Sequence, residues 1–295
     1  MYLVIRLWLR AIRIRFLFAS IVAVINGLAL SFWKNASFDI TYALLTCGGV
    51  ICLHASVDLL NDYWDYRRGI DKVTKRTKFS GGTGILPENL LKPKTVYCAG
   101  ILFLLLGTLI GIYFVAIRGI TIAVILIFAI FSIYFYSIKI VNIGLGELFV
   151  AIKSSMIVIG TFYVQTGSID MAALYVGIII GTLSASVLFV NSFPDYDADR
   201  DNGRRTLVII LGKKHGAKVL SLLVSLTYIM IAAGVLLGYI KLYSLISLVS
   251  IPFATRAIRY LDENNEKFEN LIPAMTTTLL YSRITGILLA IGLLL

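Results

Sequence analysis

Charged side chains are scarce in this sequence. Only 15% of its 295 residues are Asp, Glu, Lys or Arg, whereas 59% are hydrophobic. A soluble domain of this length needs far more polar surface, so the composition disfavours a water-soluble protein and favours a polytopic membrane protein. Cysteine is also scarce: Cys47, Cys52 and Cys98 all fall within apolar runs. No pair of them indicates a disulfide or a cysteine-bound metal.

Long apolar runs take the place of polar surface. A membrane-spanning helix needs about 20 mostly apolar residues, and about nine such runs are expected here. The first is long, is flanked by arginines and ends in no small-residue cleavage site, so it is not interpreted as a removable signal peptide. We therefore expect an all-α fold with one domain over residues 1–295. The expected spans are approximately 12–33, 40–60, 94–117, 119–138, 145–165, 171–193, 216–238, 241–260 and 272–294.

The basic residues are distributed unevenly between the connections. The formal net charge is +11. If Met1 is inside and the number of spans is odd, the outer side receives only Lys34, Arg118 and Lys241. This asymmetry follows the positive-inside rule, and it predicts a cell-membrane protein whose amino terminus and long polar loops face the cytoplasm. The charge is thus explained by topology, and we expect neither a nucleic acid nor a required protein partner.

Two acidic segments stand at the inner ends of expected spans. In each, an Asn precedes an Asp by four residues, and the segments lie four spans apart, so they run in the same direction. This spacing suggests two four-helix halves related as parallel repeats, plus a ninth helix, around a central site. The first segment contains His54, Asp58, Asn61, Asp62, Asp65 and Asp71, and the second contains Asn191, Asp195 and Asp199. Pro194 is expected to break or kink the second helix.

Carboxylates at helix ends in a membrane are costly unless they face a bundle interior or bound ions. Two acidic clusters on one side of the membrane repel each other, and Mg²⁺ relieves such repulsion while bridging carboxylates to substrate phosphates. The adjoining loops supply cations for phosphate oxygens. The Ser80–Gly84 stretch has two interpretations: it presents further backbone N–H groups to phosphate, or it is a flexible loop turn. The candidate diphosphate-binding residues are Arg67, Arg68, Lys72, Arg76, Lys78, Arg200, Arg204 and Arg205.

A second set of residues is assigned to an acceptor site or to the cavity wall. Lys153 lies within a span, where a charge is rare and usually faces a cavity, although it could also snorkel to the interface. Aromatic rings can stabilise an allylic cation, but near an interface they are commonly anchors. Arg283 lies within the last span, with the same alternatives. The set comprises His54, Asp58, Tyr134, Tyr136, Lys139 and Lys153.

The two acidic motifs carry a family resemblance that extends over most of the chain. The chain resembles the UbiA superfamily of intramembrane prenyltransferases in NDYWDYRRGID with KRTKFSGGTGILPENLLKP, in YFYSIKIVNIGLGELFVAI, and in NSFPDYDADRDNGRRTLVIILGKKHGAK. The resemblance implies nine helices around a cavity that opens laterally to lipid. It also implies that Mg²⁺ binds the diphosphate of a polyprenyl donor. The implied metal-binding residues are Asn61, Asp62, Asp65, Asp71, Asn191, Asp195 and Asp199, with Asp62, Asp65, Asp195 and Asp199 also catalytic.

One departure from the family pattern indicates a branch. Many members have an acid at the position of Gly69, whereas here the next acid is Asp71. This variant resembles the branch that prenylates 1,4-dihydroxy-2-naphthoate for menaquinone biosynthesis, which implies an aromatic acceptor. Two alternatives stay open: a geranylgeranyltransferase acting on geranylgeranylglyceryl phosphate, and a transporter for a polyanion or a divalent cation.

Overall fold

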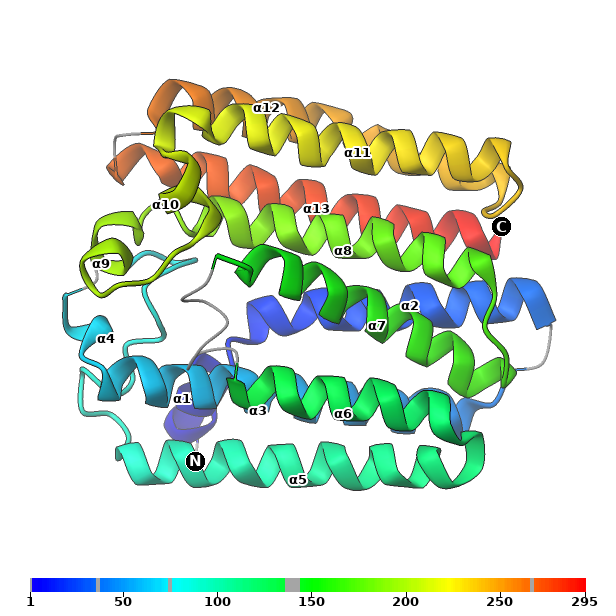
Figure 1. Ribbon diagram of the computed structural model, residues 1–295, viewed down its shortest axis with the longest axis horizontal. Helices are drawn as coiled ribbons and strands as arrows, with labels where there is room; N and C mark the ends of the chain where they lie inside the picture. Colours follow the sequence, from blue (N-terminus) through cyan, green and yellow to red (C-terminus); the bar gives the residue numbers. More distant parts are fainter. Residues whose placement is uncertain (1, 36–37, 74–75, 136–143, 266–267) are drawn as a thin grey trace.

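The long helices of the protein lie side by side along one axis (Figure 1). The structure is a computed structural model that describes residues 2–35, 38–73, 76–135, 144–265 and 268–295. Within these ranges every regular element is an α- or 3₁₀-helix and no strand occurs. The expected all-α fold is therefore confirmed.

Seven segments are long and apolar enough to cross a membrane: Ile14–Lys34, Ile40–Arg67, Pro93–Arg118, Gly146–Thr166, Met171–Asn191, Lys213–Leu236 and Phe268–Leu294. The long α-helices are α1 (Tyr2–Ala11), α2 (Ile14–Asn35), α3 (Ile40–Arg67), α5 (Pro93–Arg118), α6 (Ile120–Phe135), α7 (Gly146–Thr166), α8 (Met171–Asn191), α11 (Gly216–Leu236), α12 (Ile251–Asn264) and α13 (Leu271–Leu294). The short elements are α4 (Ile70–Val73), α9 (Tyr196–Asp201), α10 (Leu207–Leu211), η2 (Lys213–His215), η3 (Leu242–Ser250) and η4 (Phe268–Asn270).

Two of the expected spans have a different form. Helix α6 is apolar but has 16 residues, and the rest of the expected 119–138 span lies outside the described residues. The expected 241–260 span is the 3₁₀-helix η3 followed by α12. Because a 3₁₀-helix repeats every three residues, Ser244, Ser247 and Ser250 share one buried face. Ser250 reaches Thr285 of α13 at 2.6 Å. The count of nine spans stays a prediction.

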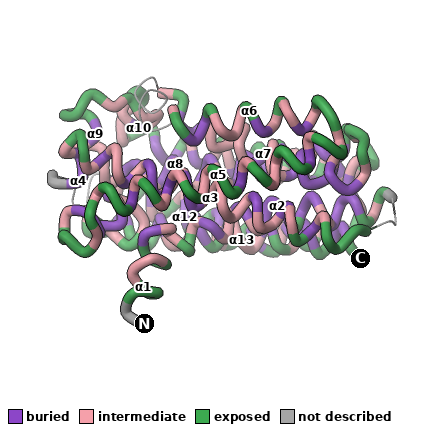
Figure 2. Tube along the Cα trace, turned by 90° about the horizontal axis from the view of Figure 1, so that it is seen from below, coloured by how far each residue is buried: buried purple, intermediate pink, exposed green. Residues whose placement is uncertain are grey.

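Helix α1 was not expected from the apolar runs. It ends at Ala11, and Arg13 has a φ of 44°, a left-handed conformation that separates α1 from α2. As a result α1 projects from one end of the bundle (Figure 2). This break lets Arg10 donate to the carbonyl oxygen of Thr83, in the loop between α4 and α5, and lets Arg13 donate to Asp62 of α3.

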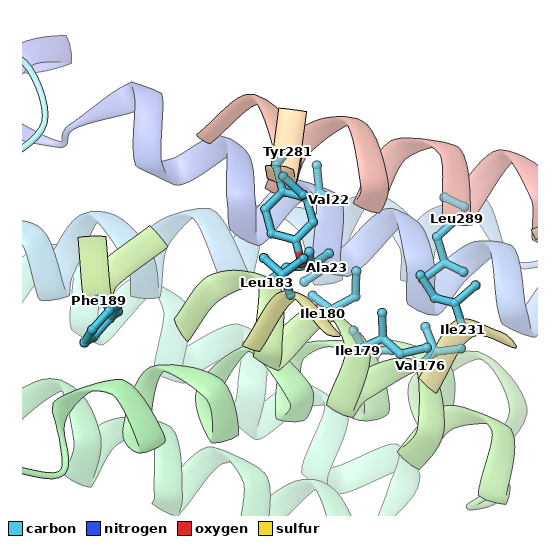
Figure 3. Packing of buried hydrophobic residues seen from close by; sticks show 14 of the residues in the cluster. Val22, Ala23, Val176, Ile179, Ile180, Leu183, Phe189, Ile231, Tyr281 and Leu289 are labelled. Atoms are coloured by element: carbon cyan, nitrogen blue, oxygen red, sulfur yellow. The ribbon is translucent and has the colours of Figure 1, made fainter. Parts of the chain in front are cut away.

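Helices α2, α8, α11 and α13 enclose the largest hydrophobic cluster. In Figure 3 the ring of Tyr281 lies beside Val22, Ala23 and Leu183. Lipid tails are as apolar as these side chains, so close helix contact depends on small residues. A Cβ at Gly181 of α8 would lie 2.6 Å from the carbonyl oxygen of Ala151 in α7. The α7–α8 contact therefore requires glycine at this position.

The two ends of the bundle differ in character. At one end, Asp39 and Asp170 cap α3 and α8 by accepting hydrogen bonds from the N–H groups of Tyr42 and Ala172. At the opposite end, the short helices α4, α9 and α10 gather beside the last turns of α3 and α8 (Figure 1). Both acidic motifs therefore lie at the same end of the molecule.

This arrangement predicts the labelling pattern of single cysteines. In a background without Cys47, Cys52 and Cys98, we expect Leu90→Cys and Asn202→Cys to react with an impermeant maleimide from the same membrane side, and Ser168→Cys from the opposite side. All three positions are exposed. Labelling of positions 90 and 202 from opposite sides would contradict a shared site.

Candidate active site

A cavity of about 430 Å³ runs between α2, α3, α6, α7 and α8. Its wall is apolar along most of its length, with Phe114, Leu126, Phe149 and Leu183 among the lining residues. At the end near α4 and α9 the wall becomes polar. The acids and amides of both motifs that line this end are Asn61, Asp65, Asp71, Asn191, Asp195 and Asp199. One cavity thus combines a highly charged end with an apolar body.

Arg204 joins the two acidic motifs. It forms an ion pair with Asp65 of α3, and its Nη1 donates to Oδ1 of Asp199 in α9 at 3.0 Å. Arg68 adds a second, longer contact with Asp65 at 3.3 Å. The side chain of Arg204 is only 12% exposed. A buried cation between two carboxylates offsets the repulsion that would otherwise separate the two motifs.

The glycine-rich loop after α4 packs on the remaining acids. The N–H group of Gly81 donates to Oδ2 of Asp195 at 3.1 Å, while Oδ1 of Asp195 is buried and has no hydrogen-bond partner among the described residues. Gly82 has a φ of +72°, and a Cβ there would lie 2.8 Å from Oδ1 of Asp71. Glycine is favoured at position 82 because the left-handed backbone angle strains other residues and because a Cβ would force the Asp71 carboxylate or the loop to shift.

Asp62 has a different environment from its neighbours. Its carboxylate accepts hydrogen bonds from Arg13 and from the hydroxyl of Thr83, and it does not line the cavity. Asp62 therefore ties α3 to the segment between α1 and α2 and to the glycine-rich loop. Arg10 extends this link by donating to the carbonyl oxygen of Thr83 at 2.7 Å and to Glu88 at 2.7 Å.

Burial and neighbouring charges raise the pKa of two carboxyl groups that lie outside the membrane-spanning helices. Burial, together with the charge of Asp199, raises the pKa of Asp195 to about 8. Burial, together with the charges of Asp62 and Asp65, raises the pKa of Asp71 to about 7. Both groups are therefore partly protonated near neutral pH. Such shifts cluster at functional sites and mark places where a further cation would be stabilised.

The sequence of residues 20–280 matches the profile of the UbiA prenyltransferase family. This match covers most of the chain. The chain belongs to the UbiA prenyltransferase family. It is 28% identical to the 1,4-dihydroxy-2-naphthoate octaprenyltransferase of Bacillus subtilis over 94% of this chain and 88% of the relative. It is 27% identical to the 2-carboxy-1,4-naphthoquinone phytyltransferase of Synechocystis over 97% of this chain and 92% of that relative.

Solved structures of UbiA homologues share the fold. The apo structure of a homologue from Aeropyrum pernix has a TM-score of 0.71 at 15% identity, covering 94% of this chain and 97% of that one. A homologue from Archaeoglobus fulgidus, solved with DMAPP and Mg²⁺, has a TM-score of 0.65 at 15% identity, covering 96% and 99%. The family match, the named relatives and the seven apolar segments together indicate an integral membrane prenyltransferase, and they do not support the transporter alternative.

The basic residues that were predicted to bind the diphosphate fall into two groups in the structure of this prenyltransferase. Arg204 lies in the site and Arg68 contacts Asp65 at its edge. The others described are exposed and do not line the cavity: Arg67, Arg76, Lys78, Arg200 and Arg205. Arg76 pairs with Glu88 at 2.5 Å, and Arg200 pairs with Asp197 and Asp201. The side chain of Lys72 lies outside the described residues.

Only some of the residues that were predicted to form the acceptor site line the cavity. His54, Asp58 and Lys153 line the cavity beyond its charged end. Tyr134 is 38% exposed and does not line it. Tyr136 and Lys139 lie outside the described residues. Arg283, another cation within a span, lines the cavity and donates to the carbonyl oxygen of Arg15 at 2.5 Å.

Sequence reasoning did not single out Arg13, Thr83 or Glu147 as site residues. Arg13 was counted only for topology, because its contact with Asp62 spans 49 positions in the chain. Glu147 begins α7, is buried, lines the cavity and accepts from the N–H group of Leu207 at 3.3 Å. An acid at the very start of an apolar span was the available signal for Glu147.

The site gives a test of the glycine-rich loop. We expect Gly82→Ala to lower prenyl transfer at least about 10-fold, because the new Cβ must displace the loop from Asp71. Gly238→Ala is the matched control: its φ is also +72°, but its Cβ would meet nothing within 4 Å. Turnover and thermal unfolding of both purified variants are compared. Equal turnover of both variants would show that the loop contact with Asp71 is dispensable.

Proposed function

We propose that this prenyltransferase transfers a polyprenyl group from a polyprenyl diphosphate to an aromatic acceptor, 1,4-dihydroxy-2-naphthoate, in an Mg²⁺-dependent reaction of menaquinone biosynthesis. The observation that carries the proposal is the meeting of both acidic motifs around Arg204 at one end of an apolar cavity. It is supported by relatives named as naphthoate octaprenyltransferases and by homologues solved with DMAPP or GPP and Mg²⁺.

The donor set fits Mg²⁺ shared with a diphosphate. Within the described residues no three His, Cys, Asp or Glu side chains are already arranged to hold a metal alone. The unpartnered oxygen of Asp195 and the raised pKa values of Asp195 and Asp71 nevertheless mark a place that favours a cation. Bound Mg²⁺ would supply positive charge to the leaving diphosphate. The proposed ligands are Asn61, Asp65, Asp71, Asn191, Asp195 and Asp199, and Asp62 is assigned a supporting role.

The chain's own residues then orient and shelter the reacting atoms. Arg204 and Arg68 lie where they can share their N–H groups between carboxylates and phosphate oxygens. Beyond the charged end, the apolar wall accommodates the prenyl chain and excludes water from the carbocation formed when the carbon–oxygen bond breaks. The rings of Phe16, Phe128 and Phe149 line this wall, and ring faces attract a cation.

The acceptor is proposed to lie beside Lys153. This cation is within α7, lines the cavity and has no hydrogen bond or ion pair in the described part of the chain. A naphthoate carries a carboxylate next to its hydroxyl group, so it needs a cation apart from the diphosphate. Lys153 meets that need, and this favours a carboxylated aromatic ring over the lipid-phosphate alternative. The chain is also similar to the solved digeranylgeranylglyceryl phosphate synthase, with 19% identity and a TM-score of 0.66. At this identity the similarity supports a shared fold and does not indicate a shared acceptor.

The same proposal includes the location of the enzyme. The clustering of basic residues near the motif end follows the positive-inside rule, so we propose that the site opens toward the cytoplasmic face of the cell membrane. The polyprenyl diphosphate would then enter with its chain in the bilayer and its diphosphate at the cytoplasmic surface.

The metal site predicts the effect of removing single acids. We expect Asp65→Ala and Asp195→Ala each to lower turnover more than about 100-fold, since each removes a proposed ligand and leaves the fold intact. Asp197→Ala is the control, because Asp197 is exposed beside the site. EDTA should abolish activity and Mg²⁺ should restore it. Turnover above roughly a tenth of the parent rate, a barrier change under about 1.4 kcal/mol, would argue against direct ligation.

The acceptor site predicts a selective change in KM. Lys153→Met keeps length and apolarity but removes the charge, so we expect the acceptor KM to rise about 10-fold or more with little change in the donor KM. Lys218→Met is the control, since Lys218 is exposed on α11. A rise in the donor KM alone would move Lys153 to the diphosphate site, and unchanged constants would make it structural.

A further inference from the structure

Three polar side chains form a connected line beyond the charged end of the cavity. Oγ of Ser20, in α2, lies 2.7 Å from Nδ1 of His54, in α3. Nε2 of His54 lies 3.4 Å from Oδ2 of Asp58, one helical turn further along α3. All three residues line the cavity. The line therefore runs from one helix to the next and ends at a carboxylate.

The position of Asp58 along α3 can be compared with the positions of the proposed metal ligands on the same helix. It shares the cavity face of α3 with Asn61 and Asp65 and precedes Asp65 by seven residues, which is about 10 Å along a helix. The reacting carbon of the donor is bonded to the diphosphate, and an attacking ring must approach it within about 3.5 Å. In the proposed function, the part of the cavity next to Asp58 is therefore the place for the acceptor ring.

The Asp58 carboxylate retains binding capacity. Its side chain is 13% exposed, and its Oδ2, although 3.4 Å from Nε2 of His54, is buried without a hydrogen bond in the described part of the chain. Buried polar atoms are usually paired, so an unpaired oxygen beside a cavity points to a ligand group. The charged groups that act on Asp58 are His54 and Asp62 on its own helix, Lys153 on α7, and Arg13 before α2.

We propose that Asp58 is the general base that accepts the hydroxyl proton of the aromatic acceptor, with His54 and Ser20 as positioning residues. This inference rests on the proposed function and adds a role that the metal site cannot supply. With the Oγ–H of Ser20 donating to Nδ1 of His54, the imidazole proton is on Nε2, the ring nitrogen that lies 3.4 Å from Oδ2 of Asp58. Asp58 then faces a phenol, while Lys153 faces the carboxylate of the same ring.

The step balances in protons and electrons. The carbon–oxygen bond of the donor breaks and its electron pair leaves with the diphosphate. The π electrons of the ring form the new carbon–carbon bond as the acceptor O–H bond breaks and its proton passes to Asp58. The ring regains aromaticity by losing a group from carbon, either a proton that passes to the released diphosphate or CO₂ from its carboxylate, and Asp58 returns its proton to the oxygen. The enzyme ends unchanged.

The test compares variants in the full-length enzyme. Asp58→Asn keeps the shape but removes the base, and we expect kcat to fall roughly 10²–10⁴-fold, the usual range for general base catalysis. The affinity for a thiolodiphosphate analogue of the donor should stay within about twofold, which also verifies folding. Asp58→Glu retains a carboxylate and should recover part of the rate.

A series of hydroxynaphthoates with increasingly acidic hydroxyl groups gives a second readout. The rate deficit of Asp58→Asn should shrink along this series, because a more acidic phenol needs less help to lose its proton. A merely structural role would give a constant deficit. Glu147→Gln serves as the competing carboxylate of the cavity: a loss there, with none in Asp58→Asn, would overturn the proposal.

The positioning residues are tested by conservative rescue. His54→Gln keeps an N–H donor near Asp58 and should retain more of kcat than His54→Leu, with the acceptor KM little changed in both. His215→Gln is the control, since His215 is exposed. If the parent enzyme transfers no prenyl group to any hydroxyaryl acceptor, the proposed function fails and the base with it. If the parent is active and Asp58→Asn keeps more than about a tenth of its rate, only the base is refuted.

Discussion

The repulsion between buried carboxylates is the constraint on which the site depends. Asp65, Asp71, Asp195 and Asp199 are brought to one end of a membrane bundle, where water is too scarce to screen their charges. In the structure Arg204 partly offsets this repulsion, because it forms an ion pair with one acid from each motif. Among the described residues Asp71 and Asp195 form no such ion pair, and burial together with neighbouring acids raises their pKa values. A metal and a diphosphate complete the charge balance in the proposed function.

The loop after α4 couples this electrostatic cluster to the rest of the fold. Gly81 donates to Asp195, Gly82 lies against Asp71, and Thr83 donates to Asp62. Arg10 contacts the same loop by donating to the carbonyl oxygen of Thr83, and Arg13 pairs with Asp62, to which Thr83 also donates. Since these contacts join segments far apart in the chain, the loop keeps its place only when α1, α3 and α9 are all assembled. The loop thus contacts three acids, through the N–H group of Gly81, the close approach of Gly82 and the hydroxyl of Thr83.

The cavity wall changes in polarity along its length, so different parts of the cavity suit different parts of the two proposed substrates. The charged end suits a diphosphate, the apolar body suits an isoprenoid chain, and the level of Asp58 and Lys153 suits a polar aromatic ring. Helical periodicity explains the order, because His54, Asp58, Asn61 and Asp65 follow one face of α3. Asp62, one position away from that face, turns out of the cavity and takes a supporting role.

The sequence alone determined the all-α class, the apolar runs that become the long helices, and the two acidic motifs, because hydrophobic length and helical spacing are local properties. It also indicated Arg204 and Lys153 among several cations. It could not separate Arg204 from Arg200 or Arg205, nor predict that Arg13 and Thr83 bind Asp62. Those distinctions depend on contacts between segments 21 to 139 positions apart. Only the tertiary structure decided them, because a side chain's partner is set by which helix packs beside it.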